Sequence, residues 1–254
     1  MNLIKRLLFS LLGVKNYLLV VSRTFLLLYR LRLIKGNKLF DCHYFVKKLI
    51  KNGDTVIDIG ANLGYYSVIF SKLVGNSGKV YSVEPVQLYR RILENNTRSC
   101  KNVEIIPYAL GETDEQKIKM GAPSEANYFS HGRTHVLDKN DECSMVFDAT
   151  VMRPDTLFAH LNSLQYIKCD IEGYEGIAIP LFEKIFDRFQ PIVQIEIAGE
   201  NMASLTNFFK SKAYRVFTLK GERLKEVLSE SQKTFGDFFF VPANKIEMFS
   251  RYIV

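Results

Sequence analysis

Residues 56–67 read VIDIGANLGYYS, and this stretch decides the fold. Its first four residues favour a buried strand, Gly60 and Gly64 mark a turn, and the apolar spacing over 65–74 predicts a helix. A strand that ends in a glycine turn and continues as a helix is how many α/β proteins hold nucleotides. The stretch therefore predicts an α/β fold with a ligand site at this turn.

Short apolar runs alternate with helical segments along the rest of the chain. After the first strand at 55–59, further strands are expected at 79–83, 103–107, 165–169, 192–197, 214–219 and 237–241. This alternation predicts a doubly wound, Rossmann-like and mostly parallel sheet with helices on both faces. Residues 111–150 break the rhythm: KIKM (117–120) and MVFDATV (145–151) could form extra strands, and the polar loop between them fits either a substrate lid or a plain surface insertion.

The basic charge of the chain is concentrated in its first 40 residues. The formal charge is +7, but residues 1–40 hold eight Lys or Arg and no acid, which leaves 26 bases against 27 acids elsewhere. A near-neutral body disfavours a nucleic-acid-binding face. The four cysteines are scattered without a CxxC pair, which disfavours a disulfide framework or a zinc site and favours a reducing, cytoplasmic compartment.

Residues 1–40 are expected to form a basic, apolar helical extension of a domain that covers 41–254. No uncharged run exceeds eight residues, well short of the roughly 18 that a spanning helix requires. The charges inside the segment share one face of a helical wheel: Lys5, Lys15, Arg23 and Arg30. This pattern fits a helix that lies in a membrane surface, and it equally fits one packed on the domain or on a partner subunit. Gly13 and Asn16 are the places where the helix could divide.

Acidic residues stand at or near the carboxyl ends of four predicted strands. They are Asp58, Glu84, Asp170 with Glu172, and Glu196. Ligands of open α/β sheets bind beyond this edge, so the side chains should line one crevice. A phosphate-rich ligand would call for Lys or Arg, whereas carboxylates suit a cation or the hydroxyl groups of a sugar.

The glycine turn departs from the dinucleotide fingerprint G-x-G-x-x-G. Asn62 and Tyr65 replace its second and third glycines, and Asn62 would intrude where the pyrophosphate should lie. These replacements disfavour a nicotinamide-dependent oxidoreductase. S-adenosyl-L-methionine fits better because it has a cationic sulfonium, a ribose and no phosphate.

Several segments together resemble the FkbM-type group of class I S-adenosylmethionine-dependent methyltransferases. They are VIDIGANLGYYSVIFSKLVG with GKVYSVEP, then VEIIPYALGE, then YIKCDIEGYEGIAIPLF with IVQIEI, and they lie within residues 45–245. The resemblance implies a seven-stranded sheet with an antiparallel last strand. It also implies methyl transfer, most often to a hydroxyl of a sugar or a secondary metabolite. A catalytically silent, membrane-associated binding module on the same scaffold is the alternative.

The resemblance also implies roles for individual residues. The methionine and ribose parts of the cofactor should lie against Asp58, Gly60, Ala61, Asn62 and Gly64. Glu84 should accept hydrogen bonds from the ribose hydroxyls, and Ala109 and Leu110 should lie near the adenine. Asp170 should lie beside the methionine end and the reacting methyl group.

Methyl transfer to a hydroxyl requires a group that removes the proton of the acceptor. The candidates are Asp170, Glu172 and Glu196, with His131 and His135 if the long loop folds over the site. An extended backbone would point Asp170 and Glu172 to one side, where their repulsion could raise one pKa, and Lys168 could orient either of them. No metal is expected at these acids. His43 and Cys42, on a helix predicted to start at Asp41, are expected on its surface or in packing.

The apolar, basic extension suggests a methyl acceptor made at the inner face of the cytoplasmic membrane, such as a glycolipid or a polysaccharide precursor. Residues 1–38 would then make a peripheral membrane contact.

Overall fold

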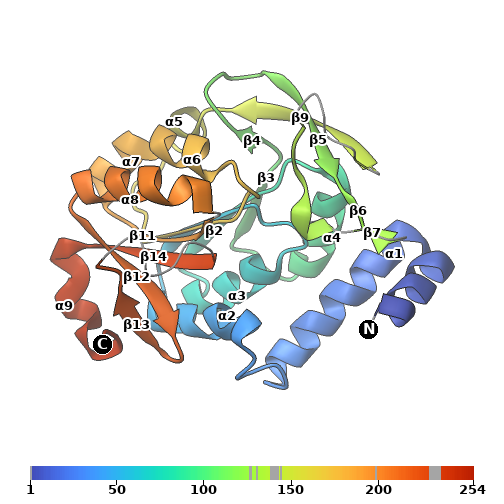
Figure 1. Cartoon of the computed structure of the whole chain (residues 1–254), viewed down its shortest axis with the longest axis horizontal. Coiled ribbons are helices and arrows are strands. Elements are labelled where there is room, and N and C mark those ends of the chain that lie inside the picture. The colour runs from blue at the N-terminus through green and yellow to red at the C-terminus, as the bar shows by residue number, and fades with distance from the viewer. Residues whose placement is uncertain are drawn as a thin grey trace.

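The computed structural model describes residues 2–125, 128–129, 131–137, 143, 145–197, 199–228 and 236–254. Within these residues the main sheet has eight strands in the order β13-β12-β14-β11-β10-β1-β2-β3 (Figure 1). Their bounds are β1 (Thr55–Ile59), β2 (Lys79–Val83), β3 (Val103–Ile106), β10 (Tyr166–Cys169), β11 (Ile192–Ile197), β12 (Tyr214–Lys220), β13 (Arg223–Glu226) and β14 (Gly236–Pro242). In this order, the five strands β11, β10, β1, β2 and β3 each pair in parallel with the next. β14 lies between β11 and β12 and is antiparallel to both.

The seven predicted strands and the Rossmann-like fold class are confirmed, with the last of the seven antiparallel. The expected strand count was too low because β13 extends the sheet at the edge beside β12. Its sequence, RLKE, is mostly charged and lacks the apolar run that marked the other strands. Charged side chains are usual on an edge strand, where they discourage pairing with other chains.

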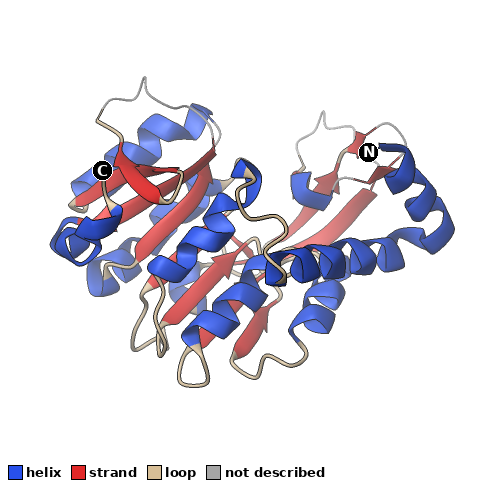
Figure 2. Cartoon of the chain, turned by 90° about the horizontal axis from the view of Figure 1, so that it is seen from below, coloured by secondary structure: helices blue, strands red, loops and turns tan. Residues whose placement is uncertain are grey.

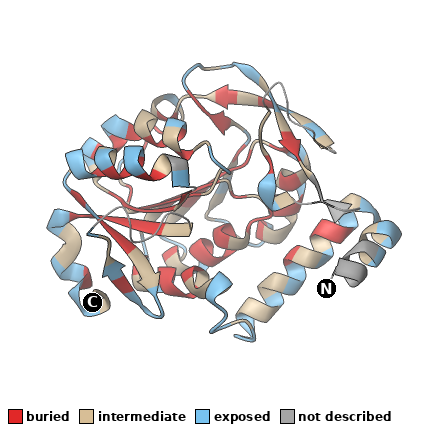
Figure 3. Cartoon of the chain, in the orientation of Figure 1, coloured by how far each residue is buried: buried red, intermediate tan, exposed pale blue. Residues whose placement is uncertain are grey.

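Helices cover both faces of the main sheet (Figure 1). One face carries α5 (Pro154–Leu157), α6 (Glu175–Ala178), α7 (Glu183–Phe189) and α8 (Met202–Ser211). The other carries α2 (Asp41–Phe45), α3 (Tyr65–Val74) and α9 (Ile246–Phe249), and α4 (Gln87–Thr97) packs beside α3. The central strands are buried on both sides, as Figure 3 shows, which explains why they read as continuous apolar runs.

The insertion at 111–150 contains a small second sheet with the order β4-β9-β5-β8. Its strands are β4 (Ala109–Leu110), β5 (Lys117–Ala122), β8 (His135–Val136) and β9 (Met145–Met152), and a short hairpin joins β6 (Ser124–Glu125) to β7 (Tyr128–Phe129). The extra strands expected at 117–120 and 145–151 are therefore present, and they pair antiparallel with each other. Residues 126–127, 130, 138–142 and 144 of the predicted loop lie outside the described residues.

Helix α1 (Asn2–Arg30) packs against α4 and the insertion and bends at Gly13, whose φ is +67° (Figure 2). Tyr17 and Leu18 are buried there in a cluster with Leu63 and Tyr89, so part of the extension packs on the domain. The outer side of α1 is exposed. It carries Leu7, Leu11, Val20 and Leu27 together with Lys15, Arg23 and Arg30.

By length and composition alone, Leu7–Arg30 is sufficient to cross a membrane, which the spacing of its charges had not led us to expect. The core helix of a globular protein and a signal sequence both meet this criterion, so it is weak evidence for a membrane span.

Candidate functional site

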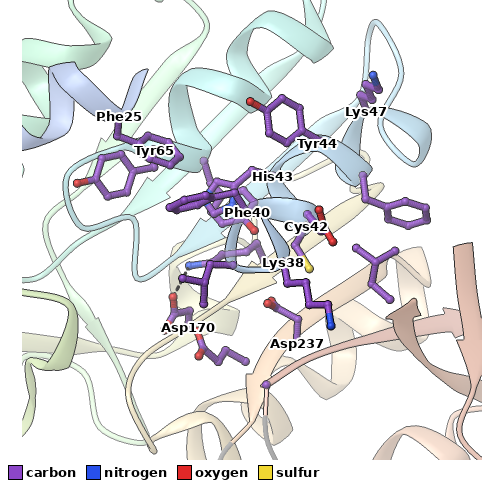
Figure 4. A pocket seen from close by; sticks show the side chains of 18 of the residues that line it. Phe25, Lys38, Phe40, Cys42, His43, Tyr44, Lys47, Tyr65, Asp170 and Asp237 are labelled. Atoms are coloured by element: carbon purple, nitrogen blue, oxygen red, sulfur yellow. Dashed lines mark hydrogen bonds and ion pairs between the residues drawn. The ribbon is translucent and has the colours of Figure 1, made fainter. Parts of the chain in front are cut away.

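A cavity of about 1270 Å³ opens at the carboxyl ends of β1, β10 and β11 (Figure 4). The turn after β1 contributes Gly60, Ala61 and Asn62, and the strand ends contribute Asp58, Lys168, Asp170, Glu196 and Asp237. The chain from Lys35 to Lys48 forms a second wall, and the β12–β13 turn forms a third. Most of the predicted site residues therefore meet in one place, as expected for ligands at the carboxyl edge of a parallel sheet.

The turn after β1 is built so that it can lie directly on the turn after β10. Gly60 has φ +73°, and a Cβ atom there would lie 1.9 Å from the backbone oxygen of Asp170. Asn62 and Gly64 also have positive φ, at +49° and +88°. Glycine adopts this left-handed conformation without steric cost, so two of these three positions use it. The turn thereby presents its backbone to the cavity.

Asp58 is fully buried at the inner end of the cavity. Its Oδ2 accepts a hydrogen bond of 2.6 Å from Ser67 Oγ, which accepts one of 2.9 Å from Ser82 Oγ. Its Oδ1 is buried and has no hydrogen-bond partner among the described residues. Burial raises the pKa of Asp58, although the nearby Lys168 charge opposes this effect. A buried carboxylate oxygen without a donor costs free energy until a donor arrives, so Oδ1 is suited to accept one from a ligand.

Glu84 lies behind the turn and is 4% exposed. Its two carboxylate oxygens accept backbone hydrogen bonds of 2.8 Å from Asn62 and from Val86. Burial raises the pKa of Glu84 to about 7. Gly64, Glu84, Ala109 and Leu110 do not line the cavity, so the structure does not bring these four predicted cofactor residues to its surface.

The insertion covers this part of the site. His131 lies on a short 3-10 helix (His131–Arg133), and its Nδ1 is 3.0 Å from Asn62 Oδ1. The Asn62 side chain also donates a hydrogen bond of 3.0 Å to the His131 backbone oxygen. His131 lines the cavity, whereas His135 lies on β8 and interacts with the Arg133 oxygen. The two histidines do not share a helix, so they lack the i,i+4 geometry that would bind a metal.

Lys168 and Asp170 form an ion pair at the end of β10. The distance from Lys168 Nζ to Asp170 Oδ2 is 3.1 Å, and the Lys168 ammonium also lies over the Tyr66 ring. Burial alone would lower the pKa of Lys168, but the carboxylates of Asp170 and Asp58 raise it above its usual range. Lys168 therefore stays charged and holds Asp170 in place, which supports the orienting role predicted for it.

Glu196 and Asp237 face each other across the β11–β14 pair and both line the cavity. Burial, followed by the charges of Asp170 and Asp237, raises the pKa of Glu196 to about 7. A carboxylate with a pKa near neutrality can accept a proton from an acceptor and release it to water. Glu196 is therefore the acid of this cavity best suited to act as a general base.

Glu172 does not line the cavity, and the extended backbone expected from Asp170 to Glu172 was wrong, although the expected repulsion by Asp170 does raise the pKa of Glu172. β10 ends at Cys169, and the chain then turns, with φ +54° at Glu172. The side chain is on the exposed side of this turn. Partial desolvation and the charges of Asp170 and Glu196 still raise the pKa of Glu172 to about 8.

His43 is a cavity residue that the sequence did not assign to the site. Its ring stacks on Tyr66 at 4.1 Å between centroids and lies among Phe25 and Phe40 (Figure 4). Within the described part of the chain, its buried Nδ1 has no hydrogen-bond partner. Burial and the Lys168 charge lower its pKa to about 3, so the imidazole is neutral. The sequence predicted a place on the helix surface or in packing for His43, and only the fold shows that its ring borders a cavity.

No group of three or more His, Cys, Asp or Glu side chains among the described residues is arranged to hold a metal ion.

The fold and the cavity define a Rossmann-like methyltransferase. The model of the methyltransferase FkbM domain matches residues 58–216, which is more than half of the chain. The chain belongs to the FkbM methyltransferase family. The predicted cofactor, S-adenosyl-L-methionine, is confirmed by this membership.

Several solved structures are similar to the chain at low sequence identity. The methyltransferase FkbM from Methylobacillus flagellatus KT matches with a TM-score of 0.52 and 16% identity, covering 79% of this chain and 47% of that one. The present chain thus spans about half the length of that protein. A SAM-dependent O-methyltransferase from Thermotoga maritima has a TM-score of 0.43 and 13% identity, covering 80% of this chain and 65% of its own. Aeropyrum pernix fibrillarin, in complex with natively bound S-adenosyl-L-methionine, has a TM-score of 0.44 and 12% identity, and the match covers 78% of this chain and 72% of that one. No curated protein matches the chain.

Proposed function

We propose that the protein is an S-adenosylmethionine-dependent O-methyltransferase that acts on a hydroxyl of a sugar, glycolipid, polysaccharide precursor or secondary metabolite. The observation that carries the proposal is the position of Glu196. Its carboxylate shares one cavity with Asp58 and the Gly60 turn, and its pKa is raised to about 7. A base placed across from the cofactor turn is what methyl transfer to a hydroxyl needs.

The residues at the inner end of the cavity fit S-adenosylmethionine. The unpartnered Oδ1 of Asp58 can accept a hydrogen bond from the ammonium of its methionine part. Gly60 lets the turn after β1 lie directly on the backbone of Asp170, and Gly60, Ala61 and Asn62 line the cavity. When bound, the cofactor supplies a methyl group activated by a sulfonium. Glu84, Ala109 and Leu110 would serve the ribose and adenine, and the insertion that carries His131 would move aside to admit them.

The side chains of the cavity have separate tasks in this reaction. Glu196 takes the proton of the acceptor hydroxyl on a carboxylate oxygen. Lys168 holds Asp170 through their 3.1 Å ion pair and keeps its carboxylate facing the cavity. The aromatic rings of Phe25, Phe40 and Tyr65 line the opposite wall and exclude water from the reacting groups.

Two measurements on the purified protein test the proposal. Calorimetric titration should show binding of S-adenosylmethionine and none of NADH. Transfer of a labelled methyl group to a panel of hydroxyl acceptors should then be lost in Glu196→Gln, while cofactor affinity is kept. Cofactor binding with no transfer to any acceptor would favour the catalytically silent module, and binding of NADH alone would refute the methyltransferase proposal.

We further propose that residues 1–40 are an extension of the 41–254 methyltransferase domain and that the enzyme works in the cytoplasm against the inner membrane face. The exposed leucines on α1, with the basic residues beside them, support a peripheral contact through residues 1–38. Deleting α1 would expose the cluster around Leu18, so point variants are the better test. Leu7→Glu/Leu11→Glu should reduce flotation with anionic vesicles, and equal flotation would remove the membrane proposal.

A further inference from the structure

The acidic side chains that line the cavity are mostly less exposed than the lysines that line it. The floor, at the strand ends, holds the half-buried or buried acids Asp58, Asp170, Glu196 and Asp237, with Lys168 as its basic residue. The rim is formed by the α1–α2 connection, α2 with the turn after it, and the β12–β13 turn, and it holds Lys35, Lys38, Lys47, Lys48 and Lys220. Asp41 and Glu222 are the acids that line this rim. The cavity thus has an acidic floor and a basic rim.

Two of the rim lysines have a structural task. Lys35 and Lys48 form ion pairs with Glu222 at 3.3 and 3.1 Å. Lys48 also donates a hydrogen bond of 2.9 Å to the Glu222 backbone oxygen. These contacts fasten the β12–β13 turn to the chain that follows α1. They neutralise Glu222 and leave the rim with an excess of positive charge.

The other rim lysines are free to meet a ligand. Lys38, Lys47 and Lys220 are exposed and have no carboxylate within ion-pair distance among the residues that the structure describes. Figure 4 labels both Lys38 and Lys47 among the lining residues, and Lys47 is drawn beyond Tyr44, away from Asp170 and Asp237. Uncompensated ammonium groups at the entrance of a cavity attract an anion and raise its local concentration.

Apolar side chains accompany these lysines. Leu31, Leu33 and Leu39, on the same connection, are 56%, 68% and 79% exposed. Leu39 lines the cavity beside Lys38. An entrance that combines free ammonium groups with exposed leucines suits a ligand that is both anionic and apolar.

We propose that the rim is a subsite for a phosphate group of the methyl acceptor, which is an amphiphilic hydroxyl compound such as a lipid-linked sugar phosphate. This inference rests on the proposed methyltransferase function. The hydroxyl-bearing part reaches Glu196 at the floor, the phosphate lies among Lys38, Lys47 and Lys220, and the apolar chain contacts Leu39. The phosphates of membrane lipids share this chemistry, so the experiment must separate the two sources.

The probe is dodecyl phosphate, used below its micelle-forming concentration, with octyl glucoside as the neutral comparison. Binding to the full chain is measured by calorimetry for the wild type, for Lys38→Glu/Lys220→Glu and for Lys72→Glu/Lys101→Glu. The last pair has the same charge change at exposed residues that do not line the cavity. We expect dodecyl phosphate to bind at least tenfold more weakly to the rim variant and to change less than twofold in affinity for the control variant. The affinity for octyl glucoside should be the same in all three proteins.

Equal effects in the two variants, or none in either, would overturn the proposal because the affinity would then reflect net charge or apolar contact alone. A second arm uses vesicles of phosphatidylcholine with phosphatidylglycerol. If the rim variant loses vesicle binding but keeps that of dodecyl phosphate, the lysines serve membrane headgroups and the subsite is refuted. S-adenosylmethionine affinity, measured in the same samples, reports on the proposed function independently of either result.

Discussion

Gly60→Ala is the substitution whose consequence follows most directly from the geometry of the site. The new Cβ would lie 1.9 Å from the Asp170 oxygen and 2.9 Å from its carbonyl carbon, both of which are backbone atoms. The left-handed φ of +73° costs about 1–2 kcal/mol for a residue with a Cβ. Forcing the β1 and β10 turns apart adds about 1–3 kcal/mol of overpacking. We therefore expect the free energy of unfolding to fall by about 2–5 kcal/mol.

The same movement should weaken cofactor binding, because the turn and Asp170 both border the site. Urea unfolding without ligand and calorimetric titration with S-adenosylmethionine measure the two effects, and we expect at least a tenfold loss of affinity. Gly221→Ala is the matched control, since Gly221 has φ +64° and no atom within 4 Å of the built Cβ. The free energy of unfolding of Gly221→Ala should fall only by the cost of the left-handed φ, about 1–2 kcal/mol. Similar stability losses in the two variants, with cofactor affinity unchanged by Gly60→Ala, would refute the reasoning.

Three further substitutions, with Leu27→Ala as a control for the third, separate cofactor binding, proton transfer and packing. Asp58→Asn should weaken S-adenosylmethionine binding at least tenfold in calorimetry while the melting temperature stays equal or rises, because the buried charge is removed; a lower melting temperature with full affinity would contradict this. The wild-type rate of methyl transfer should rise between about pH 6 and 8 as Glu196 ionises, and Glu196→Gln should abolish the rise. The pKa of Glu196 is raised from 4.5 to about 7 on folding, so its contribution to stability should diminish as the pH increases from about 4.5 to about 7. Chemical denaturation of Glu196→Gln should lack this part of the pH dependence. Leu18→Ala should cost about 2–5 kcal/mol in urea unfolding, whereas Leu27→Ala, at a position 55% exposed, should cost under about 0.5 kcal/mol.

The sheet was predictable because its central strands are buried on both faces. Stretches such as IVQIEI (192–197) are mostly apolar and rich in β-branched residues, and the observed β11 has the predicted bounds. β13 escaped because an edge strand needs neither an apolar run nor alternation. The acids at the strand ends were also predictable, since the topology of a parallel sheet brings the carboxyl ends together.

The missing parts of the site depend on segments that are distant in sequence. His43 borders the cavity because the chain after α1 returns across the strand ends, and no local pattern encodes that return. Glu172 was misplaced because the chain turns immediately after Cys169, whereas the prediction assumed an extended backbone. The cover over Glu84 depends on His131, 69 positions beyond Asn62 in the chain.

The position of β14 has a consequence for how the protein is made. This strand lies between β11 and β12 although both are synthesised before it. A nascent chain that has completed β12 therefore holds an open slot in its sheet, with two unpaired edges that can recruit strands from other chains. Phe238, Phe239 and Phe240 fill this slot, and Asp237 arrives opposite Glu196 in the same step. The event that closes the sheet also completes the acidic floor of the cavity, so an incompletely synthesised chain lacks the Glu196–Asp237 pair.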